Sequence, residues 1–278
     1  MNSNHSAIGA WKSRVEAHHE QSQWVMPTAM RNGDFWAETA ASFRADPLRT
    51  DDESLNIMLD LANQDDTVLD VGGGAGRLAL PFALKCQSVT VVEPSEGMLG
   101  QLRVSVAEHN VENVMMVRAK WEEAEVAAQD FVVCSHVVYG IPQIEDFVRR
   151  LHEHATKRVA LLSFVNAPQA HIAGLWGPVH GEARIELPAL PELVNVLWEM
   201  GIHPDVTMIP GKQRRLFDST DSAMDEMMRR LFIGDNPIKE ERLRAALPDF
   251  LEDTPDGYVI KGSKPARQGI VHWTTCDA

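Results

Sequence analysis

A glycine-rich turn and one acidic residue carry the clearest chemical signal in this sequence. The short apolar run 67–71 leads into the loop Gly72–Gly76, and a segment with helical spacing follows. Glycine lets the backbone turn sharply and approach a ligand closely, and the start of the next helix presents free N–H groups. Glu93 ends the following apolar run, 19 residues after Gly74. Because this is the spacing at which a carboxylate meets ribose hydroxyls, the pattern predicts a ribose-bearing cofactor.

The register of the glycines indicates which cofactor is bound. A dinucleotide-binding loop reads G-x-G-x-x-G, which would need a glycine at position 77, where Arg77 stands; the third glycine is Gly76 instead. With V-L-D-V-G-G-G-A-G-R at 68–77 and V-V-E-P-S at 91–95, the chain resembles the class I S-adenosylmethionine-dependent methyltransferases. The resemblance covers 64–166 and is only topological beyond that range. It implies S-adenosyl-L-methionine as the cofactor, and the register disfavours a nicotinamide-dependent oxidoreductase.

The resemblance also implies roles for matching positions. Asp70 orients the loop or meets the cofactor amine, Glu93 takes both ribose hydroxyls, and Pro94 and Met98 flank the adenine. Where the family has an acidic residue for the adenine, this chain has Lys120 and its neighbours, so Trp121 or a backbone group is left to contact the ring. The cofactor-binding positions expected on this basis are Asp70, Gly72, Gly73, Gly74, Gly76, Glu93, Pro94, Met98, Lys120, Trp121, Ser135 and His136.

The acceptor is expected beside the segments 135–142 and 164–168, since ligands of parallel sheets bind outside the carboxyl ends of the strands. His136 and Tyr139 are the candidate catalytic residues, either as a base or as groups that hold the acceptor. Alternatively, His136 supports the methionine end of the cofactor and Tyr139 packs. A base is needed only for an acceptor that carries a proton, because positioning alone supplies much of the acceleration of a methyl transfer.

Apolar runs that alternate with helical segments predict the elements that position these residues. Such alternation indicates an α/β fold: a doubly wound, mostly parallel seven-stranded sheet with helices on both faces. The expected strands lie at 67–71, 88–93, 113–118, 130–135, 159–165 and 203–209, with closing strands at 256–261 and 268–273. The expected domain is 51–278, with N-terminal helices before it and a helical insertion before the last strand.

Three further segments are expected to complete the site. Residues 1–50 are predicted to form two or three short helices that act as a lid, with breaks that include Pro27. Within them, Phe35 and Trp36 either cover the cofactor or anchor the helices. The segment 176–181 reads as a Gly/Pro/aromatic loop that caps the substrate, or a surface loop with one packed Trp. The insertion at 218–250 extends the acceptor wall or makes an oligomer contact.

Composition and residue spacing disfavour nucleic-acid, membrane-spanning and metal-binding proteins. A net charge of −14 disfavours nucleic acid as a partner, and the segment Cys134–His136 lacks the Asn/Asp-Pro-Pro turn of base-amino methyltransferases. No apolar run is long enough for a membrane span. The widely spaced Cys86, Cys134 and Cys276 indicate reduced cysteines in the cytoplasm, and the spacings of the histidine pairs His18/His19 and His152/His154 favour no metal.

A small-molecule acceptor is therefore expected, methylated in line and mainly through proximity. The alternative is a cofactor-binding regulatory or assembly protein of the same fold without turnover. The acceptor atom and the oligomeric state stay open.

Overall fold

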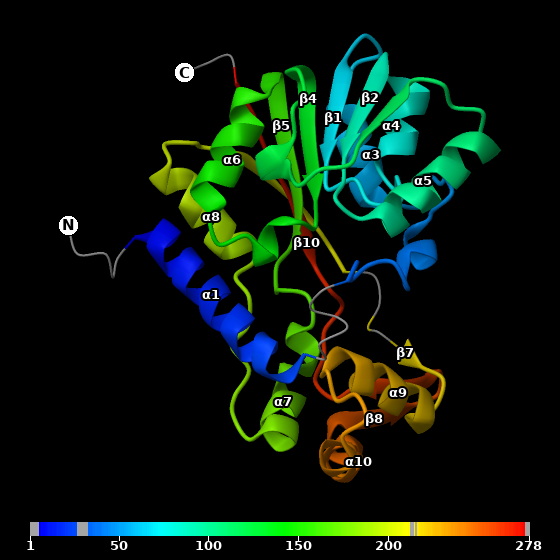
Figure 1. Ribbon diagram of the computed structural model, residues 1–278, viewed down its shortest axis with the longest axis vertical. Helices are drawn as coiled ribbons and strands as arrows, with labels where there is room; N and C mark the ends of the chain where they lie inside the picture. The colour runs from blue at the N-terminus through cyan, green and yellow to red at the C-terminus, as the bar shows by residue number, and fades with distance from the viewer. Residues whose placement is uncertain (1–5, 27–32, 212–213, 215, 276–278) are drawn as a thin grey trace.

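A seven-stranded sheet forms the centre of the computed structural model, which describes residues 6–26, 33–211, 214 and 216–275 (Figure 1). The strand order is β3-β2-β1-β4-β5-β10-β6. Strands β1 to β5 pair in parallel, and β10 runs antiparallel to both of its neighbours. The bounds are Thr67–Val71 (β1), Ser88–Val92 (β2), Val114–Val117 (β3), Gln129–Ser135 (β4), Ala155–Phe164 (β5), Asp205–Ile209 (β6) and Gln268–Thr274 (β10). This order confirms the predicted doubly wound α/β class.

Helices cover both faces of the sheet because the side chains of each strand alternate between two cores. Val68 and Leu69, neighbours on β1, lie in different cores. One core joins the sheet to α3 (Glu53–Asp60), α4 (Ala79–Lys85) and α5 (Glu96–Glu108), and the other joins it to α1 (Ala7–Val25), α6 (Ile144–Glu153) and α8 (Leu190–Glu199). The two groups of helices stand on opposite sides of the sheet in Figure 1.

The N-terminal region differs from the expected series of short helices. Residues 7–25 form the single helix α1, which packs on α6 and α8 and is fixed by a hydrogen bond from Trp11 Nε1 to the Ile141 carbonyl at 2.8 Å. The following described part, from residue 33, runs as turns into the short 3₁₀ helix η2 (Ala40–Phe43). Two helical elements, α1 and η2, thus lie among the described residues of 1–50, which is within the expected number, but α1 is longer than the short helices expected because it packs along α8. The predicted break at Pro27 lies outside the described residues.

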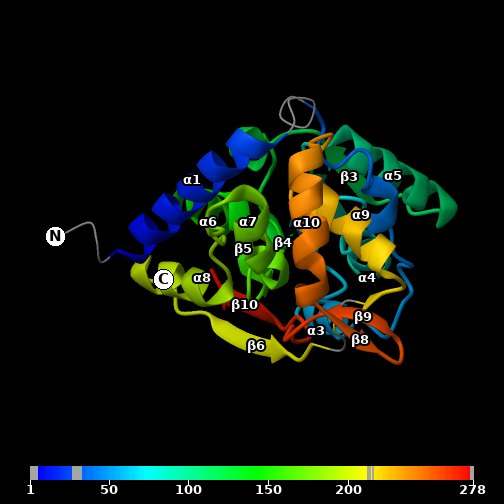
Figure 2. The ribbon, with the colours of Figure 1, turned by 90° about the horizontal axis from the view of Figure 1, so that it is seen from below.

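A small accessory unit lies at one end of the main sheet, below it in Figure 1, and Figure 2 shows it from below. It combines α7 (Ala173–His180), α9 (Thr220–Arg230) and α10 (Pro237–Phe250) with the three-stranded sheet β7-β9-β8. Those strands span Leu216–Phe217 (β7), Leu251–Thr254 (β8) and Gly257–Ile260 (β9). The unit contains the predicted insertion at 218–250.

Two predictions about the accessory unit were wrong. The strand expected at 256–261 does not close the main sheet, because β9 pairs with β8 in a tight antiparallel hairpin and with β7 on its other side. The segment 176–181 is no substrate-capping loop but mostly the end of α7, a helix that includes Pro178. Trp176 is 1% exposed and belongs to the core of the accessory unit. A buried indole anchors the unit and cannot act as a mobile cap.

No helix among the described residues is long and apolar enough to cross a membrane. Cys86 and Cys134 are buried free thiols, whereas Cys276 lies outside the described part of the chain.

Candidate cofactor and acceptor sites

The loop between β1 and α4 has the backbone conformation that only glycine adopts easily. Gly72, Gly74 and Gly76 have φ angles of +71°, +55° and +89°, and a side chain is strained in that region. The Gly72 N–H donates to the Val92 carbonyl at 2.8 Å, which ties the loop to the end of β2. At Gly74 an added Cβ would meet only Met98 Sδ, at 3.7 Å, so this glycine faces open space. The loop is a cradle that a side chain would fill.

Glu93 follows β2 and is held against this loop. Its Oε2 accepts from the Gly74 N–H at 3.0 Å, its Oε1 accepts from the Ser95 N–H at 2.8 Å, and the residue is 6% exposed. Burial raises the pKa of Glu93, while the two backbone hydrogen bonds oppose that shift. A carboxylate has about four lone-pair positions. Glu93 therefore has capacity left for two further donors, which suits a ribose diol.

Asp70, at the carboxyl end of β1, lies under the loop. It is 1% exposed, and its Oδ2 has no hydrogen-bond partner among the described residues. That oxygen is 2.8 Å from the position of a Cβ added to Gly73. Burial and the neighbouring charge of Glu93 raise the pKa of Asp70 to about 7. A buried carboxylate oxygen without a donor is costly unless a ligand supplies one, so these residues fit a cofactor with an ammonium group.

A cavity of about 330 Å³ lies above the loop, and we call it the cofactor cavity. Nine of the predicted positions line it: Asp70, Gly72, Gly73, Gly74, Glu93, Pro94, Met98, Ser135 and His136. Sequence reasoning also placed Trp36 near the cofactor, and it lines the cavity, whereas the lining residues Phe43 and Arg77 were missed. Gly76 supports the cavity from below, because an added Cβ would lie 2.4 Å from Leu102 Cδ1 in the core.

Lys120 and Trp121 do not line the cofactor cavity. Trp121 begins η3 (Trp121–Glu123) and is 4% exposed. Its indole Nε1 donates to the Phe147 carbonyl at 3.4 Å, and the Arg150 guanidinium lies 4.8 Å from its ring centroid. The indole packs against α6 in this structure, and its expected contact with an adenine stays a prediction. Lys120 is exposed beside it.

The segment that starts at residue 33 covers the cofactor cavity. Asp34 fixes this segment, since its Oδ2 accepts from Ser95 Oγ at 2.9 Å and from the Gly97 N–H at 3.0 Å. Trp36 stacks edge-on with Phe43 at 5.5 Å and is 44% exposed. Half-exposed rings that line a cavity provide apolar surface for a flat ligand.

His136 and Tyr139 meet after β4. His136 has a φ of +59°, an uncommon conformation outside glycine, and its ring stacks on Phe164 with centroids 4.2 Å apart. Its Nδ1 lies 2.9 Å from the Tyr139 hydroxyl, which accepts from the Phe164 N–H at 2.7 Å. Burial and the Arg77 charge lower the pKa of His136 to about 4, while burial raises the pKa of Tyr139 to about 12. The imidazole is therefore neutral at pH 7 and a weak base.

A second cavity, of about 340 Å³, adjoins the first and shares Trp36 with it. We call it the acceptor cavity; its residues come from α1, the turn at Phe35, the start of α7 and the segment before α8. They are His18, His19, Ser22, Met26, Phe35, Trp36, Pro168, Gln169, Ala170, Ala173, Arg184, Glu186, Leu187 and Phe232. Gln169 and Phe232 have φ angles of +68° and +54°, and such backbone strain concentrates at functional sites. Sequence reasoning weighed His18 and His19 only as metal ligands and missed Arg184.

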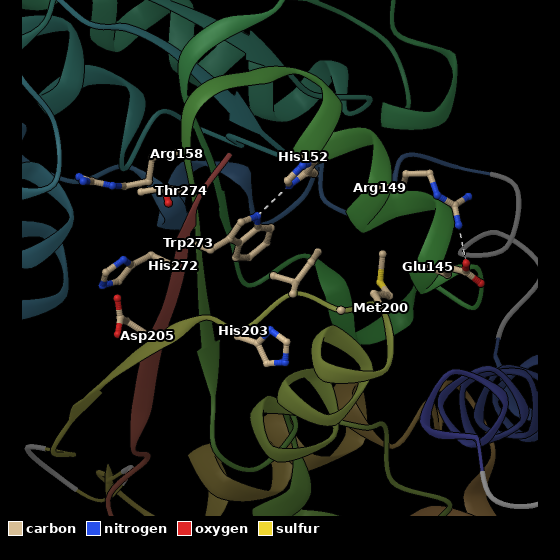
Figure 3. A pocket seen from close by; sticks show the side chains of 12 residues that line it. Glu145, Arg149, His152, Arg158, Met200, His203, Asp205, His272, Trp273 and Thr274 are labelled. Atoms are coloured by element: carbon tan, nitrogen blue, oxygen red, sulfur yellow. Dashed lines mark hydrogen bonds and ion pairs between the residues drawn. The ribbon is translucent and has the colours of Figure 1, made fainter. Parts of the chain in front are cut away.

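A third cavity, of about 560 Å³, opens at the amino ends of β5 and β6, away from the glycine loop (Figure 3). Trp273 Nε1 donates to His152 Nδ1 there at 3.1 Å, and Arg149 pairs with Glu145 beside it. The cavity contains none of the predicted site residues. No group of three or more potential metal ligands occurs among the described residues.

Comparisons with known proteins agree with this geometry. A methyltransferase domain model matches residues 68–158. The chain is 29% identical over 114 residues to the probable ribosomal RNA small subunit methyltransferase A of Methanosphaera stadtmanae, covering 40% of this chain and 41% of that protein. It is 24% identical over 148 residues to the ubiquinone biosynthesis O-methyltransferase of Rickettsia canadensis, covering 49% of this chain and 61% of that protein. The match thus spans about half the length of these relatives.

Solved structures share the fold. The YcgJ protein from Bacillus subtilis superposes with a TM-score of 0.55 at 17% identity, covering 80% of this chain and 97% of that one. Magnesium protoporphyrin IX methyltransferase from Synechocystis with bound S-adenosylhomocysteine gives a TM-score of 0.51 at 12% identity, covering 88% and 95%. Together with the cradle at Gly72–Gly76 and the buried carboxylates beside it, these matches identify residues 68–158 as a methyltransferase domain with the fold of the class I S-adenosylmethionine-dependent enzymes.

Proposed function

We propose that the protein methylates a small-molecule acceptor bound in the acceptor cavity. The observation that carries this proposal is the position of the two cavities, which lie side by side and share Trp36. Both are within the size range of small-ligand sites, roughly 300–1,000 Å³. Both also lie near the ends of β1, β4 and β5, where ligands of this sheet type bind.

In this proposal the residues of the cofactor cavity hold S-adenosyl-L-methionine. Glu93 accepts hydrogen bonds from the ribose hydroxyls, and Asp70 pairs with the ammonium group. Pro94 and Met98 contact the adenine. When bound, the cofactor supplies an electrophilic methyl group on a sulfonium. The protein positions the acceptor for in-line attack and keeps water out of the path, which accounts for the acceleration through proximity.

His136 and Tyr139 shape the wall of the cofactor cavity in this proposal, and they do not act as a base. In the tautomer that we propose, the Tyr139 oxygen accepts from the Phe164 N–H and its own proton is donated to His136 Nδ1. The lone pair of the neutral imidazole is then already used, and its second nitrogen carries the proton. An imidazole with a pKa of about 4 also has little tendency to take a proton at neutral pH.

A small acceptor is favoured over RNA, although one relative is described as a ribosomal RNA methyltransferase. The net charge of −14 opposes a phosphate backbone. The acceptor cavity is covered by α1 and by the accessory unit, through Phe232. A nucleotide in a long strand would have to pass both.

Two measurements test the proposal. Calorimetric titration should show binding of S-adenosylmethionine and S-adenosylhomocysteine, and tighter binding of NAD would refute the cofactor assignment. A transfer assay with labelled cofactor and a panel of small phenols, amines, thiols and carbon acids should then give a methylated product. Binding without transfer to any acceptor would favour the regulatory or assembly protein of the same fold.

A further inference from the structure

Arg184 is a half-buried cation fixed in the wall of the acceptor cavity. Its guanidinium carbon lies 3.8 Å from the ring centroid of Trp176, a residue of the buried core of the accessory unit. Three hydrogen bonds link it to α1: Nη1 donates to Gln21 Oε1 at 2.9 Å, and Nη2 donates to Ser22 Oγ at 2.8 Å and to His18 Nε2 at 2.7 Å. The side chain is therefore held in one orientation before any ligand arrives.

Arg184 forms no ion pair among the described residues, although the charge of exposed Glu182 acts on it. Its three hydrogen-bond acceptors are neutral, because burial and Arg184 itself lower the pKa of His18 to about 4. Burial lowers the pKa of Arg184 to about 10, which leaves it charged at neutral pH, and exposed Glu182 is near enough to oppose that shift. Glu186 lines the same cavity, but among the described residues it is in no ion pair with Arg184. A partly buried, unpaired charge is costly unless a ligand compensates it.

The guanidinium retains donors for such a ligand. Arginine has five N–H groups, and the three hydrogen bonds use three of them. The remaining cavity lining is largely apolar and aromatic, with Phe35, Trp36 and Phe232 among its residues. A fixed cation inside an apolar cavity is the arrangement that recognises a carboxylate on a small apolar body.

We propose that the methyl acceptor is a small apolar or aromatic carboxylic acid whose carboxylate binds Arg184. This inference rests on the proposed function, because it takes the cavity beside Trp36 as the acceptor site. The larger neighbouring cavity, of about 890 Å³, also contains cations, but Arg214 and Arg230 are paired with Glu252 and Glu226, and Lys264 and Arg267 are exposed. Arg184 is the stronger anion site because it is half-buried and held in place by three hydrogen bonds and the Trp176 ring.

The test uses the full-length protein saturated with S-adenosylhomocysteine. Benzoate, para-hydroxybenzoate, phenylacetate and anthranilate are titrated calorimetrically, each beside its neutral carboxamide of similar size. We expect at least one carboxylate to bind about 10- to 100-fold more tightly than its amide, the range for hydrogen bonds to a charged group. If no pair shows this preference in the parent protein, the inference is wrong, and no variant is needed to decide that.

Two variants locate the preference. In Arg184→Gln the carboxylate and its amide should bind about equally, whereas Arg184→Lys should keep part of the preference because the charge remains. Arg214→Gln is the matched control and should bind like the parent, since Arg214 is paired with an exposed glutamate. An undiminished preference in both Arg184 variants would overturn the assignment.

The test of the carboxylate site can fail independently of the test of methyl transfer. Retained carboxylate preference without methyl transfer to any acceptor rejects methylation and leaves the anion site. Methyl transfer to neutral acceptors, with no preference for carboxylates, rejects the anion site and leaves the methyltransferase.

Discussion

The Gly74 amide donates a hydrogen bond of 3.0 Å to Oε2 of Glu93, a residue 19 positions later in the chain. This bond joins the glycine loop to the residue that follows β2 and fixes the carboxylate at the floor of the cofactor cavity. The Ser95 amide holds the other oxygen at 2.8 Å. The side chain is thus aimed before the cofactor binds, so little freedom is lost on binding.

Replacing Glu93 should weaken cofactor binding with a limited effect on the fold. For Glu93→Ala we expect a loss of roughly 1.5–3 kcal/mol in S-adenosylmethionine affinity, the range for a lost charged hydrogen-bond partner. Some thermal stability should also be lost, because the Gly74 and Ser95 amides lose their acceptor. Calorimetry and thermal unfolding measure the two effects. Glu96→Ala is the control, since Glu96 is exposed and pairs with Arg103; equal affinity in both variants would remove Glu93 from the site.

Substitutions in the glycine loop should distinguish a glycine that faces the cofactor cavity from one that faces the protein core. In Gly74→Ala the methyl group meets only Met98 Sδ at 3.7 Å, so the protein should fold at a cost of about 1–2 kcal/mol for the left-handed backbone. Cofactor affinity should fall about tenfold or more, since the methyl group enters the cavity. In Gly76→Ala the methyl group would displace buried Leu102, so stability should fall further.

Gly100→Ala is the control for this series, because an added Cβ there meets nothing within 4 Å. It lies within α5, so stability should rise by about 0.5–1 kcal/mol with binding unchanged. Parent-like cofactor affinity in Gly74→Ala would show that the loop is not the cradle.

Cofactor affinity should depend on pH through Asp70. Because the pKa of Asp70 is raised to about 7, the group is protonated in mild acid and ionised above neutrality. A cationic cofactor favours the ionised form, so affinity should rise as the pH increases to about 7 and level off above it. Below that pH, binding should release a proton, which calorimetry in buffers of different ionisation enthalpy detects. Asp70→Asn should remove both effects, and an unchanged profile in that variant would assign the titration to another group.

His136 should not control the rate by proton transfer. We expect His136→Asn to change the saturated rate by less than about tenfold, below the range of roughly 10²–10⁴ for loss of a general base. The parent rate should not show an imidazole titration between pH 6 and 8, because the pKa of His136 is lowered to about 4. Steady-state rates with the best acceptor of the panel check this. A larger loss in the Asn variant together with a rate that rises through that interval would restore the base assignment.

The sequence by itself determined the cofactor cradle, for a local reason. Gly74 and Glu93 lie in one strand–helix–strand unit, where adjacent parallel strands bring their carboxyl ends together. Spacing along the chain therefore specifies distance in space. The glycine register and the alternation of strands and helices depend on the same local rules, so the fold class followed from them, and the resemblance to the methyltransferase family that they support implied the nine lining positions of the cavity.

Only the tertiary structure decided what surrounds the cradle. Trp121 is an aromatic residue of the kind that can contact an adenine, but in the structure its indole is buried where η3 packs against α6. Arg184 contacts Ser22 of α1, 162 residues away, and the Trp176 ring of α7, so one side chain links these two helices at the acceptor cavity. No local spacing encodes such a contact, since it depends on how the accessory unit and α1 pack against the sheet. The charge that we propose distinguishes one acceptor from another is therefore placed by packing between distant segments of the chain.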